Sequence, residues 1–200
     1  MNTSRTAAAY TSTAVRMLLL MTLVLGIAYP AAMVGVGYLM PARAHGSIIT
    51  VDGQPRGSKL IGQDFSADTR LFQSRPSHAG DNGYDPLSSG ASNLGPTSEE
   101  LAGQIHSRRQ DIETQNPGVS AIPADALTAS GSGLDPHISK EYAVLQIPRI
   151  AKETGLSEAQ LNQLVTAHTD TPALGLIGQT RVNVLELNLD LLNTLNGKGK

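Results

Sequence analysis

An uncharged apolar stretch near the amino end limits what this chain can fold into more than any other feature. Residues 17–42 contain no charged side chain and are bracketed by Arg16 and Arg43. A helix needs about 20 mostly apolar residues to cross the hydrocarbon core of a bilayer, and this stretch is long enough. Its glycines and Pro30 are better tolerated in a bilayer helix than in a soluble one. The sequence therefore predicts one transmembrane helix, residues 17–42, followed by one polar domain.

A cleaved signal peptide is the alternative interpretation, because Ala42-Arg43-Ala44 resembles a signal-peptidase site. The apolar run is much longer than the roughly 7–15 residues of a signal-peptide core, which favours a retained anchor. Arg5 and Arg16, with no acidic residue before the anchor, favour a cytoplasmic amino end. We therefore expect a cytoplasmic tail at residues 1–16 and an extracytoplasmic domain at residues 43–200.

Small residues within the anchor recur at a spacing that suits close packing of helices in lipid. Ala28 is followed by Ala32, and Ala31 by Gly35. The general abundance of Ala and Gly in membrane helices explains the same pattern equally well. No Asp, Glu, Lys, Arg or His lies inside the span, which argues against an ion pathway formed by this helix alone.

Composition narrows what the domain after the anchor can do. The chain has no cysteine, so it can form neither a disulfide nor a thiolate metal site. The formal charge of −2 includes three arginines up to Arg43, so the remaining residues carry −5. A mildly acidic domain without a basic patch argues against nucleic-acid binding. The five histidines are scattered along the sequence, which argues against a metal site.

Local signals predict an α+β (mixed α/β) domain. Capping residues and helical spacing of apolar residues indicate helices that begin after Thr97, Ser139 and Ser157. Pro148 is expected to kink the second of these helices or to move its boundary. A turn is expected at Asp52-Gly53, a helix end at Asn116-Pro117-Gly118, and short strands at residues 59–62, at residues 70–73 and around Val182, Val184 and Leu185.

The residues themselves offer little catalytic apparatus. A phosphate-binding G-x-x-x-x-G-K-[ST] loop is absent from the sequence. Ser132, Asp135 and His137 invite a hydrolytic triad, but the residues around the serine do not form G-x-S-x-G. The competing interpretation is a Gly-rich turn in which Asp135-Pro136 caps the helix that follows Ser139. Arg108 and Arg109 are expected to be solvated rather than ligand-binding.

Five runs of residues together resemble the C subunit of the Kdp-type potassium-transporting ATPase. The similarity extends from the anchor to about Leu195, although His78 and Ala91 stand where the family usually has a small residue and a second Gly. The runs are residues 57–63 (GSKLIGQ), 72–77 (FQSRPS), 92–97 (SNLGPT), 127–139 (LTASGSGLDPHIS) and 181–188 (RVNVLELN).

The resemblance implies a single-pass accessory subunit of the bacterial plasma (inner) membrane. Its partners would be a channel-like potassium-binding subunit, a P-type ATPase subunit and a small single-helix subunit. Potassium would be the transported ion, and ATP would be hydrolysed by the ATPase subunit. The family is described as a catalytic chaperone that raises the ATP affinity of that subunit. Residues 127–133 have been likened to the signature sequence of ABC transporters, and the resemblance therefore also implies direct contact of this chain with nucleotide. An anchored extracytoplasmic hydrolase that uses Ser132, Asp135 and His137 is the alternative.

Two Gly-rich loops are expected to form the docking surface for the potassium-binding subunit, since such runs bury little apolar area and lose much entropy on ordering. Replacing Gly131 and Gly133 with Val is expected to leave the domain folded but to weaken assembly of the complex. We expect no catalytic residue and no metal ligand in this chain. The expected docking residues are Ser92, Asn93, Leu94, Gly95, Pro96, Ser130, Gly131, Ser132, Gly133, Asp135 and Pro136.

Overall fold

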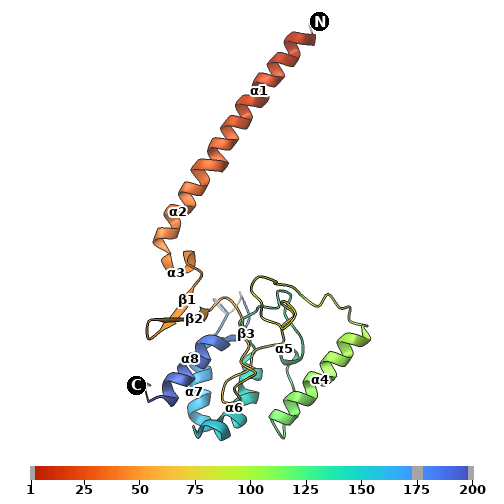
Figure 1. Cartoon of the computed structure of the whole chain (residues 1–200), viewed down its shortest axis with the longest axis vertical. Helices are drawn as coiled ribbons and strands as arrows, with labels where there is room; N and C mark the ends of the chain where they lie inside the picture. The colour runs from red at the N-terminus through yellow and green to blue at the C-terminus, as the bar shows by residue number, and fades with distance from the viewer. Residues whose placement is uncertain (1–2, 173–177, 198–200) are drawn as a thin grey trace. The chain divides into compact units, whose positions relative to one another are not determined.

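The computed structural model describes residues 3–172 and 178–197 of the chain. The chain divides into two compact units, Met1–Ile48 and Ile49–Lys200. The first unit is helical (Figure 1). Its elements are α1 (Thr3–Leu23), the π-helical turn η1 (Val24–Ala28), α2 (Tyr29–Leu39) and the single turn α3 (Pro41–Ala44).

Two prolines shape this helical unit. Pro30 has no N–H for the Gly26 carbonyl, and the turn just before it widens, so that the Tyr29 N–H donates to the Val24 carbonyl. Met40 leaves helical geometry at φ −132° and ψ 59°, because the residue before a proline is disfavoured in the α region. The continuous apolar helix therefore ends at Leu39, and the segment long and apolar enough to cross a membrane is Ala7–Leu39.

A β-hairpin follows, made of β1 (Ile48–Val51), which begins at the last residue of the first unit, and β2 (Gln54–Ser58). The predicted turn at Asp52-Gly53 is confirmed. Both residues have positive φ, 52° and 77°, as the type I′ turn of a two-residue hairpin requires.

A small antiparallel sheet lies between the helices of the second unit. Its strands are β3 (His137–Ile138), β4 (Thr169–Asp170) and β5 (Arg181–Asn183), in the order β3-β5-β4. Val182 in the central strand pairs with Ile138 on one side and with Thr169 on the other. Helices and strands are therefore mixed, as the sequence predicts.

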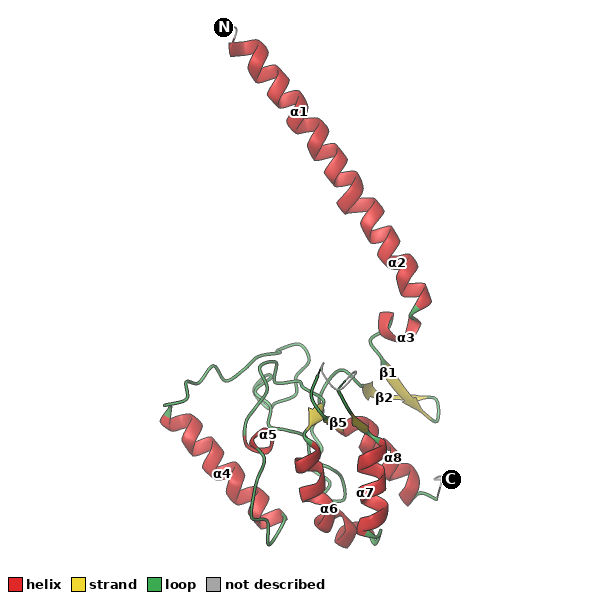
Figure 2. Ribbon diagram, turned by 180° about the vertical axis from the view of Figure 1, so that it is seen from behind, coloured by secondary structure: helices red, strands yellow, loops and turns green. Residues whose placement is uncertain are grey.

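Five helices complete the unit: α4 (Glu99–Gln115), α5 (Ala124–Leu127), α6 (Lys140–Thr154), α7 (Glu158–Ala167) and α8 (Val184–Leu195). Helix α7 packs against both α6 and α8, whereas α4 lies on the opposite side of the unit and packs against α5 (Figure 2). The core takes side chains from all five helices of the unit, from β3 and β5, and from the loop at Leu71 and Phe72. Its fully buried large apolar side chains are Phe72, Ile147, Ile150, Leu161, Val165, Val182, Val184, Leu187 and Leu191.

The predicted helix caps are confirmed except for one. Ser139 accepts from the Tyr142 N–H, and Ser157 forms a reciprocal capping box with Gln160. Helix α4 is capped by Ser98 instead of Thr97. The shift places Glu99 and Glu100 together in the first turn, where carboxylates interact favourably with the helix dipole.

The strand predictions fared worse. Residues 59–62 and 70–73 are not strands, and Val184 and Leu185 belong to helix α8 rather than to β5.

Helix α6 continues through Pro148 and begins where the sequence predicts. Val144, whose carbonyl would be bonded by an N–H at position 148, is on the exposed side of the helix, where water can satisfy that carbonyl.

Side-chain amides replace a partner strand along residues 69–73. Asn188 of α8 accepts from the Phe72 N–H at 2.8 Å and donates to the Phe72 carbonyl at 2.9 Å. Gln146 of α6 accepts from the Gln73 N–H at 2.7 Å and donates to its carbonyl at 3.3 Å. Arg149 donates to the carbonyls of Thr69 and Leu71. We call these three side chains the amide clamp; they bond the backbone of a segment that belongs to neither sheet of the described chain.

The amide clamp predicts a large effect of Asn188→Leu. The change would leave the buried N–H and C=O of Phe72 without partners, which should lower the free energy of unfolding by about 2–6 kcal/mol. Denaturant unfolding of the full chain in detergent measures it. Asn162→Leu on exposed α7 removes only a bond to its own helix and should change the stability by less than about 0.5 kcal/mol. Equal stabilities for the two variants would contradict the clamp.

Candidate functional site

The loop at residues 130–136 is bonded to several other segments of the chain, among them Val184 at the start of α8, whose N–H donates to the Pro136 carbonyl at 3.0 Å. The Ser132 carbonyl accepts from the Gly90 N–H and from the Ser89 hydroxyl, both at 2.9 Å. The Ser77 hydroxyl donates to the Gly133 carbonyl at 2.6 Å, and the Gly62 N–H donates to the Leu134 carbonyl at 2.8 Å. The loop is therefore an ordered part of the domain.

Gly131 and Gly133 in this loop have different roles. Gly133 is buried with φ +69°, and a Cβ there would lie 2.6 Å from the Gly90 carbonyl oxygen and 2.8 Å from the Ala79 nitrogen. Gly131 is exposed, and a Cβ there would meet nothing within 4 Å. The expectation that Val at both positions leaves the domain folded is therefore wrong at Gly133, which packing requires.

Residues 77–90 form the other half of this assembly. They lie in the polar run 76–96, whose composition predicts either a flexible loop or an ordered, partner-contacting loop, and their hydrogen bonds show an ordered loop. The Ser77 hydroxyl accepts from the N–H groups of Ala79 and Tyr84, at 3.1 and 2.8 Å. Tyr84 in turn donates its hydroxyl to the Arg75 carbonyl at 2.7 Å, and burial raises its pKa. We call residues 77–90 and 130–136 the braced loops. The FQSRPS run, which ends at Ser77, was the signal that could have found them.

The predicted docking loop at residues 92–97 follows the braced loops in the chain but bonds only locally. Asn93 is exposed with φ 54°, and its amide donates to the Ala91 carbonyl at 3.2 Å. Ser92 accepts from the Leu94 N–H, and the Gly95 carbonyl accepts from the Ser98 N–H that opens α4. Among the described hydrogen bonds, those leaving residues 130–136 reach other segments and not residues 92–97.

Asp135 is the charged centre of its loop. Its Oδ1 accepts from the backbone N–H of His137 at 3.0 Å and lies 3.1 Å from the His137 Nδ1, and its Oδ2 accepts from Arg75 at 3.0 Å. Burial alone would raise the pKa of Asp135, but the hydrogen bonds from His137 and the nearby positive charges hold the pKa below its usual value. Arg75 also donates to the Thr128 carbonyl, so this carboxylate fixes the loop to the domain.

The proposed triad does not assemble. Asp135 and His137 meet, but the Ser132 hydroxyl accepts from the Leu134 N–H at 3.1 Å and lies 3.4 Å from the Ser130 hydroxyl. The arrangement therefore does not support the hydrolase alternative.

The capping role expected of Asp135-Pro136 is also wrong. The Ser139 N–H and hydroxyl donate to Asp125, at 2.7 and 2.8 Å. Asp125 therefore supports the start of α6, while Asp135 serves its own loop.

Arg108 is partly buried, contrary to the expectation of a solvated side chain. It donates to the Leu127 carbonyl at 2.9 Å and to Gln104 at 3.2 Å, and burial lowers its pKa. His78 lies 3.1 Å from the same Gln104 side chain. These contacts hold α4 against the end of α5 and against the loop at residues 77–90. Arg109 is exposed, as expected, and lies 4.0 Å from Glu113.

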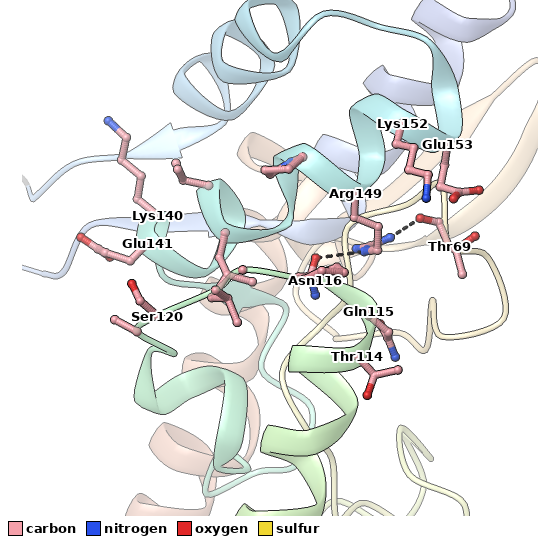
Figure 3. A pocket seen from close by; sticks show the side chains of 17 residues that line it. Thr69, Thr114, Gln115, Asn116, Ser120, Lys140, Glu141, Arg149, Lys152 and Glu153 are labelled. Carbon is pink, nitrogen blue, oxygen red and sulfur yellow. Dashed lines mark hydrogen bonds between the residues drawn. The ribbon is translucent and has the colours of Figure 1, made fainter.

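A cleft of about 1150 Å³ separates the end of α4 and residues 115–121 from α6 (Figure 3). Arg149 points into this region, but its guanidinium is engaged by the Asn116 side chain, by Gln146 and by backbone carbonyls. Burial lowers its pKa. The labelled residues of its rim include two lysines, Lys140 and Lys152, each followed in the sequence by a glutamate.

The small residues of the anchor lie on exposed helical surface. Ala28 ends the π-helical turn, and Ala31, Ala32 and Gly35 follow in α2. A Cβ added at Gly35 would meet nothing within 4 Å. Among residues 3–172 and 178–197, no three His, Asp or Glu side chains gather where they could hold a metal ion.

Comparison with known proteins gives one consistent family. A family model described as "K+-transporting ATPase, c chain" matches residues 11–193. Three similar proteins are each named "Potassium-transporting ATPase KdpC subunit". That of Kineococcus radiotolerans is 52% identical over 180 residues, 90% of this chain and 91% of that protein. That of Koribacter versatilis is 44% identical over 185 residues, covering 91% and 93%. That of Mycobacterium tuberculosis is 46% identical over 181 residues, covering 89% and 95%.

The two loop glycines give a matched pair of predictions. Gly133→Ala should lower the free energy of unfolding by at least about 1 kcal/mol, because alanine is strained at positive φ and its Cβ would meet backbone atoms. Gly131→Ala should change it by less than about 0.5 kcal/mol, because its site is open. Denaturant unfolding of both full-length variants in detergent is the measurement, and a Gly131→Ala loss as large as that of Gly133→Ala would contradict these roles.

Proposed function

The chain belongs to the KdpC family, and we propose that it assembles and stabilises its potassium-transporting ATPase complex through its loops. A KdpC chain is the non-catalytic accessory subunit of such an ATPase. The observation that carries the proposal is the bonding of the braced loops. Surface loops ordered before any partner arrives lose little conformational entropy on docking, which suits an assembly subunit.

The proposed topology has residues 1–16 in the cytoplasm, residues 17–42 in the membrane and residues 43–200 outside. One apolar helix near the amino end fits the single-pass anchor of a KdpC subunit. Every described side chain from residue 7 to residue 36 is exposed in the isolated chain, so lipid or other helices must cover this apolar surface. Arg16, the last cation before the apolar run, favours the cytoplasmic side for the amino end.

We propose that the partner of the domain is the channel-like potassium-binding subunit. Its docking surface comprises the exposed parts of residues 92–97 and 130–136. Asn93 and Gly131 project there without tertiary contacts that would occupy them. In the membrane, the small residues from Ala28 to Gly35 are proposed to pack against a helix of the complex, which also contains a P-type ATPase subunit and a small single-helix subunit.

An effect on ATP affinity, the catalytic-chaperone role, then acts through the partners. In the proposed topology the domain lies on the side of the membrane opposite to cytoplasmic ATP. Residues 127–133 are also committed within the domain, since Arg108 bonds the Leu127 carbonyl and Arg75 the Thr128 carbonyl. We therefore propose that this chain alone binds neither ATP nor potassium and that it favours the assembled state in which the ATPase subunit binds ATP tightly.

The topology is tested with single cysteines, because the chain has none of its own. Ser12→Cys lies in the proposed cytoplasmic tail and Ser107→Cys on an exposed position of α4. A membrane-impermeant maleimide applied to right-side-out spheroplasts should label position 107 at once and position 12 only after lysis. Labelling in the reverse order would contradict the topology, and loss of the position-12 segment from the mature chain would indicate a cleaved signal peptide.

The docking surface is tested by placing an arginine on each loop. Gly95→Arg and Gly131→Arg introduce bulk where a Cβ meets nothing within 4 Å, so the fold should survive and co-purification with the potassium-binding subunit should fall at least tenfold. Gly103→Arg on α4 has equally open surroundings and is the control that should assemble normally. Normal assembly of both loop variants, with unchanged potassium-stimulated ATPase activity, would refute the docking role.

A further inference from the structure

Leu87 is the most exposed of the large apolar side chains that the structure describes. It is 95% exposed, against 57% for Leu60 and 40% for Val144 in the same unit. A single exposed leucine is common on protein surfaces and needs no function. What distinguishes Leu87 is the rigidity of the turn that presents it.

Leu87 occupies a hydrogen-bonded turn at residues 85–88. The Ser88 N–H donates to the Asp85 carbonyl at 3.1 Å, and the Leu87 N–H donates to the Asp85 side chain at 2.9 Å. Pro86 stands at the second position of the turn, where its fixed φ suits the turn. The backbone of Leu87 is therefore held before any partner arrives.

The base of this turn is fixed as well. The Asp85 N–H donates to the Ala79 carbonyl at 3.0 Å, and the Gly80 N–H donates to the Ser88 carbonyl at 3.1 Å. Gly80 has φ +69°, and a Cβ there would lie 2.7 Å from the Cβ of Asp85. The two sides of the loop are therefore in contact. Tyr84 holds φ at 58°, a conformation that is uncommon for a bulky residue. Local strain of this kind, retained by surrounding bonds, is typical of functional loops.

The charge around Leu87 indicates what covers it. Between Arg75 and Arg108 the sequence contains four carboxylates and neither lysine nor arginine. Two of them, Asp81 and Asp85, are exposed in the same loop as Leu87. An anionic lipid surface would repel this loop, whereas a protein pocket with a basic rim would attract it.

We propose that Leu87 is a hot-spot residue that enters an apolar pocket with a basic rim on a neighbouring protein subunit of the complex. The proposal rests on the docking role of the loops and adds a side chain outside residues 92–97 and 130–136. A rigid apolar side chain entering a pocket gains its full burial energy and loses little entropy. Leu87 then contributes most of the binding energy, while the polar loop residues determine the orientation of the bound subunit.

The experiment measures the affinity of the full chain for the remaining subunits of the complex in detergent. Burial of a leucine predicts that Leu87→Ala weakens binding by about 10- to 100-fold. Leu87→Met conserves the apolar volume and should stay within about threefold of the natural chain. Leu60→Ala, at an exposed leucine outside the braced loops, should bind as the natural chain does. Wild-type affinity for Leu87→Ala would overturn the proposal.

A second readout separates this proposal from the docking role. If Gly131→Arg weakens assembly while Leu87→Ala does not, the hot spot is overturned and the docking role stands; if neither variant weakens assembly, both are overturned. A photo-crosslinking phenylalanine derivative at position 87 of the assembled complex should react with a protein subunit. Crosslinks to lipid instead of protein would overturn the proposal.

Discussion

The amide clamp is the interaction on which the rest of the domain depends. Asn188, Gln146 and Arg149 bond the backbone of residues 69–73, a segment that would otherwise bury unpaired amides next to Phe72 in the core. Because α6 and α8 each supply part of the clamp, it fixes those helices to the segment. Arg75 and Ser77 follow the clamped segment in the chain, and both bond the loop at residues 130–136. The loops proposed to dock have no regular structure and thus follow a segment held by Gln146 and Asn188, the most buried polar side chains among the described residues.

The sequence predicted those parts of the fold whose causes are local. Caps at Ser139 and Ser157 and the Asp52-Gly53 turn depend on residues three or fewer apart, and all are confirmed. The strands expected at residues 59–62 and 70–73 failed because an extended apolar run does not reveal what pairs with its backbone; at Phe72 the partner is 116 residues away. The helix at Val184 was missed although Asn183 with Glu186 is a capping signal, and Asn183 does accept from the Glu186 N–H.

The sequence predicted which residues belong to the candidate site but not how those residues contact one another. Family-like runs identified residues 92–97 and 127–139, and the braced loops contain much of the second. The sequence could not separate Gly133, which touches the backbone of Gly90, from Gly131, which touches nothing within 4 Å of a Cβ position. That distinction, like the exposure of Leu87, arises from tertiary contacts. An accessory subunit needs such a surface, because it contributes fixed geometry to the complex where an enzyme would contribute reactive groups.

The central claim is that the loops are already ordered and become covered on assembly. Amide hydrogen exchange of the full chain, alone and in the assembled complex, tests it most directly. The account predicts slow exchange at Gly90, whose N–H is bonded to Ser132, in both states. It predicts that exchange at residues 87, 93 and 131 slows on assembly, while the core of α6 is unchanged. Protection that appears only along the cleft between α4 and α6, with the loops unaffected, would contradict it.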